Sequence, residues 1–325
     1  MSQGWNSMLY KYVQCRNQME AILLTNPLEP LLADPGYLQL QQKRLERLEA
    51  SYIERNIKPM SRESRARFLR VHEREHKVIV DLELRSKLEH QLGPQEERIE
   101  KERVTLTNHL GQWMISQVEV KDYESGSPFP ANDRINLNKS IPYLNQHYFA
   151  NMPSTDRSIL YDRHKVQQYA DTWWDKSNPQ YLSFGVDCSN YVSQCLFAGG
   201  APMHYTGKRE TGWWYKGRTN HQEHWSFSWA VAHSLQSYLS YSISGLRANV
   251  VDYADQLTIG DVIVYDWDGD AKYQHSAIVS AMDPQGQPLV NAHTMNSKHR
   301  FWDYRDSYAW SEKTQYRFLH ILDSL

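Results

Sequence analysis

The chain opens with hydrophobic positions at helical spacing. Apolar side chains recur every three or four positions over residues 5–19 and again over residues 38–52, which predicts two amphipathic helices. Pro27 and Pro30 separate the two segments, and Pro59 follows the second one. Because proline disrupts a helix interior, these residues mark the ends of the helices.

From residue 78 the hydrophobic period changes to two. Four apolar residues alternate with three charged ones, the pattern of a strand with one buried face. The apolar residues are Val78, Val80, Leu82 and Leu84, and the charged ones are Asp81, Glu83 and Arg85. Residues 98–106 and 113–120 are predicted to be further strands. We therefore expect an α+β domain over residues 1–120, with an antiparallel sheet curled over its helices. This shape resembles cystatin-like and nuclear-transport-factor-like cones, but no motif supports the likeness and it implies no function.

A segment without apolar periodicity separates this domain from the rest of the chain. Residues 121–153 are rich in Ser, Pro, Asn and Asp, a composition typical of a linker. Residues 154–325 then form a second α+β domain. Its predicted helices cover residues 157–174, residues 188–198 and a segment from Trp229, and its predicted strands cover residues 259–265, 274–279, 289–294 and 316–322.

A cysteine stands at the start of one of these helices. Asp187 is placed to cap the helix and Gly199 to close it, which puts Cys188 in the first turn. Unbonded N–H groups and the positive end of the helix dipole favour a thiolate there. Cys188 is therefore a candidate nucleophile, and its backbone N–H is a candidate donor to an oxyanion. The alternative is a small buried residue that happens to begin a helix.

A nucleophilic cysteine needs a base, and the base needs a group that orients its ring. His275 lies near the start of a predicted strand. Strand alternation places Asn291 and His293 on one face of the next strand, so either residue can be the orienting group. Between the helix and these strands, residues 199–228 form a long aromatic loop. Its three tryptophans either line a substrate groove or pack beneath the loop; they are Trp213, Trp214 and Trp225.

Several segments together resemble a known family. They are Gly185-Val186-Asp187-Cys188-Ser189-Asn190-Tyr191-Val192-Ser193-Gln194-Cys195, Gly260-Asp261-Val262-Ile263, His275-Ser276-Ala277 and Asn291-Ala292-His293-Thr294. In this order they resemble the bacterial putative amidase domain of the papain-like cysteine hydrolase superfamily, which is distantly similar to NlpC-type cell-wall peptidases. The resemblance covers about residues 154–325. It implies a cysteine amidase or peptidase with Cys188 as nucleophile, His275 as base and His293 as orienting residue, with Asn291 as the alternative.

The implied reaction forms an acyl-enzyme at the thiol and requires no cofactor. Its substrate is a peptide or another amide, with a peptidoglycan fragment as one option. Two other functions stay open. One is a binding protein on the same fold that no longer turns substrate over. The other is a zinc peptidase, since His72-Glu73-Arg74-Glu75-His76 matches the H-E-x-x-H pattern.

The metal patterns have a simpler explanation. The zinc pattern needs a helix, but His72 and His76 fall at a predicted turn between strands, and residues four apart on a strand are roughly 13 Å from each other. The pair His221 and His224 lies in the long loop. Asp266, Asp268 and Asp270 lack the distal glutamate of a calcium-binding loop and fit a hairpin turn. No metal site is expected.

Composition limits the partners and the compartment. The formal net charge is −2, so no basic surface for nucleic acid is expected. No apolar run is long enough to span a membrane, and the first residues do not resemble an export signal. The 3 cysteines are widely spaced, which favours free thiols. A cytoplasmic protein is expected.

Overall fold

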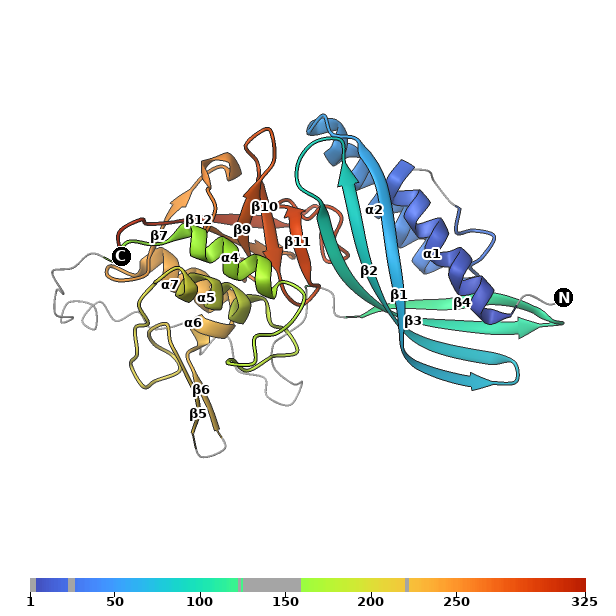
Figure 1. Ribbon diagram of the computed structural model, residues 1–325, viewed down its shortest axis with the longest axis horizontal. Helices are drawn as coiled ribbons and strands as arrows, with labels where there is room; N and C mark the ends of the chain where they lie inside the picture. The colour runs from blue at the N-terminus through green and yellow to red at the C-terminus, as the bar shows by residue number, and fades with distance from the viewer. Residues whose placement is uncertain (1–3, 23–26, 122–123, 125–158, 220–221) are drawn as a thin grey trace. The chain divides into compact units, whose positions relative to one another are not determined.

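The computed structural model describes residues 4–22, 27–121, 124, 159–219 and 222–325. They divide into two units (Figure 1), of which the first comprises Met1–Tyr123 and Asp303–Trp310 and the second comprises Glu124–Trp302 and Ser311–Leu325. Helices and antiparallel strands make up both units, as predicted. The predicted linker lies outside the described residues, apart from Lys121 and Glu124.

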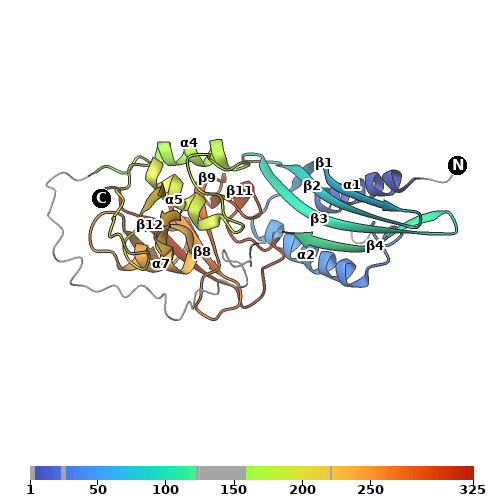
Figure 2. The same ribbon diagram turned by 90° about the horizontal axis from the view of Figure 1, so that it is seen from below.

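The first unit contains two helices and a four-stranded antiparallel sheet. The elements are α1 (Trp5–Ile22), α2 (Pro35–Glu54), β1 (Pro59–Arg74), β2 (Lys77–His90), β3 (Glu96–His109) and β4 (Gln112–Lys121). Each strand pairs with the next in the sequence, and Figure 2 shows the long strands β1, β2 and β3 curving side by side. The predicted helices and strands are thus confirmed, and most of them are longer than predicted.

One face of this sheet packs on both helices. Along β2, the side chains of Val78, Val80 and Leu82 are buried, whereas Ile79 and Asp81 between them are partly exposed. These residues join Leu9 of α1 and Leu45 of α2 in one apolar cluster. The alternation read from the sequence is therefore the buried face of the sheet.

The H-E-x-x-H segment is a hairpin and not a helix. His72 lies in β1 opposite Ile79 of β2, and Glu75 and His76 form the turn. The helical face required by a zinc peptidase is absent. Among the described residues no group of three or more His, Cys, Asp or Glu side chains could hold a metal ion.

Charged side chains also occupy the core of the first unit, which the sequence pattern did not predict. Arg16 and Arg62 contact the buried carboxylate of Glu100 at 3.1 Å and 2.7 Å. Burial alone would raise the pKa of Glu100, but the two guanidinium groups hold it well below its usual range. Glu102 accepts hydrogen bonds from Tyr12 and Tyr37 at 2.8 Å and 3.2 Å.

Helix α2 holds a segment that is distant in the sequence. Asp303–Trp310 packs in the first unit although the residues on both sides of it belong to the second. The Arg44 side chain donates to the Asp306 carbonyl at 2.6 Å, and the Arg47 side chain donates to the Arg305 carbonyl at 2.7 Å. The chain therefore leaves the second unit, is bound along α2, and returns.

The second unit is built on a six-stranded antiparallel sheet. Its strands are β7 (Ala248–Val251), β8 (Val262–Asp266), β9 (His275–Met282), β10 (Pro288–Ala292), β11 (Ser297–Phe301) and β12 (Gln315–Ile321). Their order is β11-β10-β9-β8-β12-β7. The remaining elements are α4 (Arg163–Trp173), α5 (Cys188–Ala198), α6 (Phe227–Ala230), α7 (Ala232–Tyr241), the short pair β5 (Tyr215–Thr219) and β6 (Gln222–Trp225), and a 3-10 turn (Ala254–Gln256).

The apolar core of this unit lies between the sheet and its helices. Val166 of α4, Val192 of α5 and Leu235 of α7 share one cluster with Val264 of β8 and Ile278 of β9. These helices therefore cover one face of the sheet (Figure 1), and α5 packs on this face.

Two predicted boundaries are corrected. Helix α4 begins at Arg163, because Asp162 caps it by accepting from the Lys165 N–H at 3.1 Å; residues 157 and 158 of the predicted helix lie outside the described residues. The third predicted strand ends at Ala292 and not at residue 294. Thr294 has φ of +87°, a left-handed conformation that a strand cannot accommodate.

The Asp-rich segment after β8 is a hairpin turn, as predicted. The Asp266 carboxylate accepts from the backbone N–H groups of Gly269 at 2.9 Å and Ala271 at 2.7 Å. Gly269 has φ of +70°, and a Cβ there would lie 2.8 Å from the Lys313 carbonyl oxygen. The turn therefore uses Asp266 to bind its own backbone.

The three tryptophans of the long loop are buried. Trp213, Trp214 and Trp225 are 0%, 2% and 4% exposed. The Trp213 ring lies 4.9 Å from the Trp229 ring and donates to Ser193 Oγ at 3.0 Å. The structure therefore supports the interpretation that these tryptophans pack beneath the loop, and not the interpretation that they line a substrate groove. His221 lies outside the described residues.

Candidate active site

Cys188 is the first residue of α5, as predicted, but Asp187 does not cap the helix through its side chain. The Asp187 carboxylate instead accepts from the Phe184 N–H at 3.0 Å and from the Asn190 side-chain amide at 2.9 Å. Its own N–H donates to Thr294 Oγ1 at 3.2 Å. Asp187 therefore ties the start of α5 to the segment that follows β10.

The Cys188 thiol is buried and protonated at rest. The residue is 3% exposed, and its sulfur lies 3.8 Å from Ser189 Oγ. Burial raises the pKa of the thiol, and hydrogen bonds from Ser276 and Ser189 only partly oppose this effect. The negative charge of Asp187 acts in the same direction as burial. The partly exposed thiolate expected at a helix N-terminus is thus not the resting state.

His275 is turned away from Cys188. Its neighbour Ser276 faces α5, where the Ser276 and Ser189 hydroxyl oxygens are 3.0 Å apart. Because successive side chains of a strand point to opposite faces, the His275 ring lies on the other side of the sheet. There its centroid is 5.4 Å from the Tyr265 ring and 5.8 Å from the Trp267 ring. The predicted pairing of Cys188 with His275 is therefore absent from this structure.

His275 is also poorly suited to carry a proton where it lies. It is 0% exposed, and burial lowers its pKa to about 4; the charge of Arg300 lowers the pKa further, and the charge of Glu124 raises it. The Glu124–Arg300 ion pair is itself buried, with the two charged groups 2.6 Å apart. At neutral pH the His275 ring is neutral and packed in an aromatic layer.

His293 is the histidine that reaches the start of α5. Its Nδ1 lies 2.8 Å from an Asp187 carboxylate oxygen, and its Nε2 lies 2.7 Å from the Trp173 carbonyl oxygen. Its ring stacks on Tyr191 of α5 with centroids 4.0 Å apart. Both partners are acceptors, so both bonds form only when both ring nitrogens carry hydrogens. The ring thus lies between the carboxylate of Asp187, the residue before Cys188, and a backbone carbonyl.

Asn291 lies on the same side of the sheet but has other partners. Its amide group donates to Asp171 at 3.0 Å, and its carbonyl oxygen accepts from Ser280 Oγ at 2.7 Å and the His299 N–H at 2.8 Å. Neither Asn291 nor His293 contacts His275. The structure thus brings His293 to Asp187, the residue before Cys188, and leaves His275 on the other side of the sheet.

The Gly260-Asp261 motif has a structural role. The buried Asp261 carboxylate accepts from Arg163 at 2.8 Å and from the backbone N–H groups of Thr258 and Ile321 at 2.8 Å and 2.9 Å. His320 adds a contact at 2.7 Å. Asp261 thereby joins α4, β8 and β12.

Sequence reasoning missed two residues beside the thiol. Asp187 was assigned only a capping role, although the carboxylate meets His293. Ser276 was not predicted to lie near the thiol, although it follows His275 directly in the sequence. The signal for Ser276 was its position in the strand, since a side chain adjacent to His275 must face the other side of the sheet.

Comparison with known proteins supports the resemblance noted in the sequence. Residues 160–319 match the family model described as "Putative amidase domain", so this part of the chain is similar to that domain. The chain is 48% identical over 167 residues to "Uncharacterized protein YhbB" of Bacillus subtilis (strain 168). That alignment covers 51% of this chain and 52% of the relative, so the chain spans about half the length of the curated relative it matches. No solved structure matches the chain. No helix among the described residues is long and apolar enough to cross a membrane.

Proposed function

We propose that the second unit hydrolyses an amide bond, with the Cys188 thiol as nucleophile on a papain-like fold. The observation that carries this proposal is the position of Cys188 as the first residue of α5, inside the segment that matches the amidase family. The Asp187–His293 pair lies at the same end of the helix. A cysteine-bearing helix against an antiparallel sheet that supplies a histidine is the arrangement a thiol hydrolase requires.

His293 takes the role of base in this proposal, in place of His275. When the His293 ring is neutral, it makes only one of its two hydrogen bonds, and its other nitrogen can accept the thiol proton. Asp187 then stabilises the imidazolium that forms. Because the resting thiol is buried and protonated, proton transfer and attack follow substrate binding.

The reaction balances with water as the only co-reactant. The thiolate attacks the amide carbonyl carbon, and the Cys188 N–H at the helix start donates to the developing oxyanion. The C–N bond breaks as His293 returns its proton to the leaving amine, which leaves an acyl group on sulfur. Water hydrolyses this thioester and restores the thiol. Peptides and muropeptides are the substrate classes with such a bond that we would examine first.

The direct test is incubation of the full chain with peptide and muropeptide libraries, followed by mass spectrometry of the products. The wild-type protein should release amine products. Cys188→Ser should release none, because a serine hydroxyl is a far poorer nucleophile without its own activation. Cys195→Ser is the matched control, since Cys195 lies two turns along α5 and is 0% exposed. Equal product release by the wild-type protein and Cys188→Ser would overturn the proposal.

A non-catalytic binding protein on the same fold is the second candidate. Two observations favour it, namely that Cys188 is 3% exposed and that His275 faces away from it. The same libraries distinguish the two functions, because a binding protein would retain a substrate class without cleaving it.

A further inference from the structure

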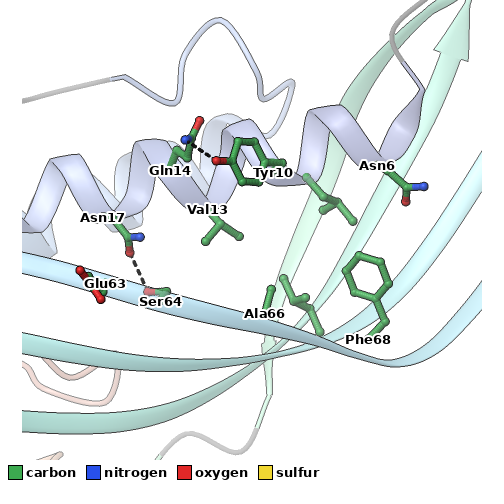
Figure 3. A pocket seen from close by; sticks show the side chains of 11 residues that line it. Asn6, Tyr10, Val13, Gln14, Asn17, Glu63, Ser64, Ala66 and Phe68 are labelled. Atoms are coloured by element: carbon green, nitrogen blue, oxygen red, sulfur yellow. Dashed lines mark hydrogen bonds between the residues drawn. The ribbon is translucent and has the colours of Figure 1, made fainter.

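The first unit contains a cleft that the proposed amidase function does not use. It lies between α1 and the strand β1 (Figure 3) and has a volume of about 840 Å³. Its apolar lining is formed by Leu9, Val13, Ala66, Phe68 and Leu82, and its polar lining by Asn6, Tyr10, Gln14, Asn17, Glu63 and Ser64. The lining contains no lysine or arginine, so the cleft itself suits apolar and neutral polar groups.

The cleft opens along an edge strand. Among the described residues, β1 is hydrogen-bonded to β2 only, and it ends the order of strands in its sheet. The outer N–H and C=O groups of such a strand are a template for another extended chain. Ser64, Ala66 and Phe68 point from β1 toward α1 in Figure 3, so a strand added beside them would direct every second side chain into the cleft.

Exposed apolar side chains gather at the same place. Tyr10 of α1 is 65% exposed, and Phe68 and Leu69 of β1 are each 46% exposed. The register of β1 against β2 shifts between Phe68 and Arg70, which lets consecutive apolar residues face outward. Large apolar side chains grouped around a cleft are typical of a binding surface.

The opposite face of β1 has a different character. Arg65 and Arg67 alternate with Ser64, Ala66 and Phe68 of the cleft, and the Arg67 side chain, 70% exposed, pairs with Glu83 of β2 at 2.9 Å. Arg65 lies directly opposite Arg85 of β2 and has no ion-pair partner among the residues that the structure describes. Arg85 pairs with Glu97 of β3 at 3.6 Å, so Arg65 is the arginine of this pair that a carboxylate from another chain can contact.

We propose that this cleft and the adjoining edge of β1 bind an extended peptide whose side chains alternate between apolar and acidic. The peptide pairs with β1 through its backbone. Its apolar side chains enter the cleft between Val13 and Phe68, and its acidic side chains face Arg65. A second copy of β1 fits less well, because it would bring its own Arg65 and Arg67 to the same edge.

The test uses fluorescence anisotropy of the full chain with a fluorescein-labelled peptide of four Leu-Glu repeats. The wild-type protein should bind it, and a peptide of four Leu-Lys repeats should bind at least about tenfold more weakly, a difference of about 1.4 kcal/mol. Two further Leu-Glu peptides carry N-methyl groups, one on every leucine and one on every glutamate. Alternate N–H groups of a strand point to opposite sides, so one of these should lose binding and the other should keep it.

Matched variants locate the site. Arg65→Glu should weaken binding about tenfold, and Ala66→Glu, which places a charge in the cleft mouth, should weaken it at least as much. Arg74→Glu makes the same charge change at the far end of β1 and should leave binding unchanged. Thermal unfolding midpoints of all variants identify any loss caused by misfolding. Equal binding of the Leu-Lys peptide, equal binding of both methylated peptides, or self-association in place of peptide binding would each overturn the proposal.

Discussion

At the scale of single residues, burial decides the state of the candidate nucleophile. The helix N-terminus favours a thiolate, but Cys188 is 3% exposed and the pKa of its thiol is raised. Desolvation of a small anion therefore outweighs the helix dipole in the resting protein. In the proposed mechanism, substrate binding must therefore favour transfer of the Cys188 thiol proton to His293, because the resting site does not.

His293 and Asn291 should respond differently to substitution. His293→Ala should lower kcat for amide hydrolysis by about 100-fold or more, because a positioned general base contributes about that much. Asn291→Ala should change kcat little, since Asn291 contacts Asp171 and Ser280 and not His293. Steady-state kinetics on a cleaved peptide would show the order. A larger loss in Asn291→Ala than in His293→Ala would contradict our assignment.

His275 should control stability and not turnover. Its pKa is about 4 in the folded protein and about 6.5 when unfolded. The unfolded state therefore binds a proton first as the pH falls, and stability is lost between pH ~6.5 and pH ~4, by roughly 3 kcal/mol in total. His275→Gln removes this titration, so the wild-type protein should lose thermal stability faster than the variant over this range.

The carboxyl group of Asp303 changes stability with pH in the opposite direction to His275, so the wild-type protein must be compared with His275→Gln. Burial raises the pKa of Asp303 to about 6, so this carboxyl adds stability as the pH falls through the same range. Asp303 is unchanged in His275→Gln, and its effect cancels in the difference between the two proteins. Parallel pH profiles would show that His275 does not titrate as described.

At the scale of helices and strands, local patterns predicted most of the fold. The alternation around Val80 identified β2 and its buried face, and Asp187 and Gly199 marked the ends of α5, because periodicity and end signals are local properties. The faces of β9 and the end of β10 were harder to predict. The side of the sheet that His275 faces depends on register, and the end of β10 depends on the left-handed Thr294; neither follows from the hydrophobic pattern.

The segment bound by α2 was also beyond prediction from sequence. Its contacts join residues that are far apart in the sequence, such as Arg47 and Arg305, which are separated by 258 positions. Asp306 forms a buried ion pair with Arg98 of β3. No periodicity signals such a pair, because polar residues are expected at the surface.

Asp306→Asn should destabilise the first unit by about 2 kcal/mol, since it removes one of the two buried carboxylates that pair with Arg98 and leaves Glu96 as the other. Glu54→Gln is the matched control. It breaks the pair between Glu54 and Arg305, whose side chains are 60% and 30% exposed, and an exposed pair contributes less than about 1 kcal/mol. Urea unfolding of both variants measures the difference, and equal midpoints would contradict the importance assigned to the buried pair.

At the scale of the whole molecule, the family match and the structural units do not coincide. Residues 160–319 match the amidase family, yet Asp303–Trp310 within that range packs in the first unit. The first unit is therefore more than an appended module, because it binds part of the matched segment along α2. The α+β class and the similarity to the amidase family were both predictable from sequence, whereas the packing of Asp303–Trp310 in the first unit was not.

The central claim is that Cys188 attacks an amide carbonyl. It is tested most directly by mixing the protein with a peptide that it cleaves, quenching in acid and mapping the acyl adduct by mass spectrometry. We predict an adduct with the mass of the acyl portion on Cys188, present in wild-type protein and in Cys195→Ser. The same peptide should leave no adduct on Cys188→Ser. Cleavage with no adduct on Cys188, or an adduct on another residue, would contradict the account.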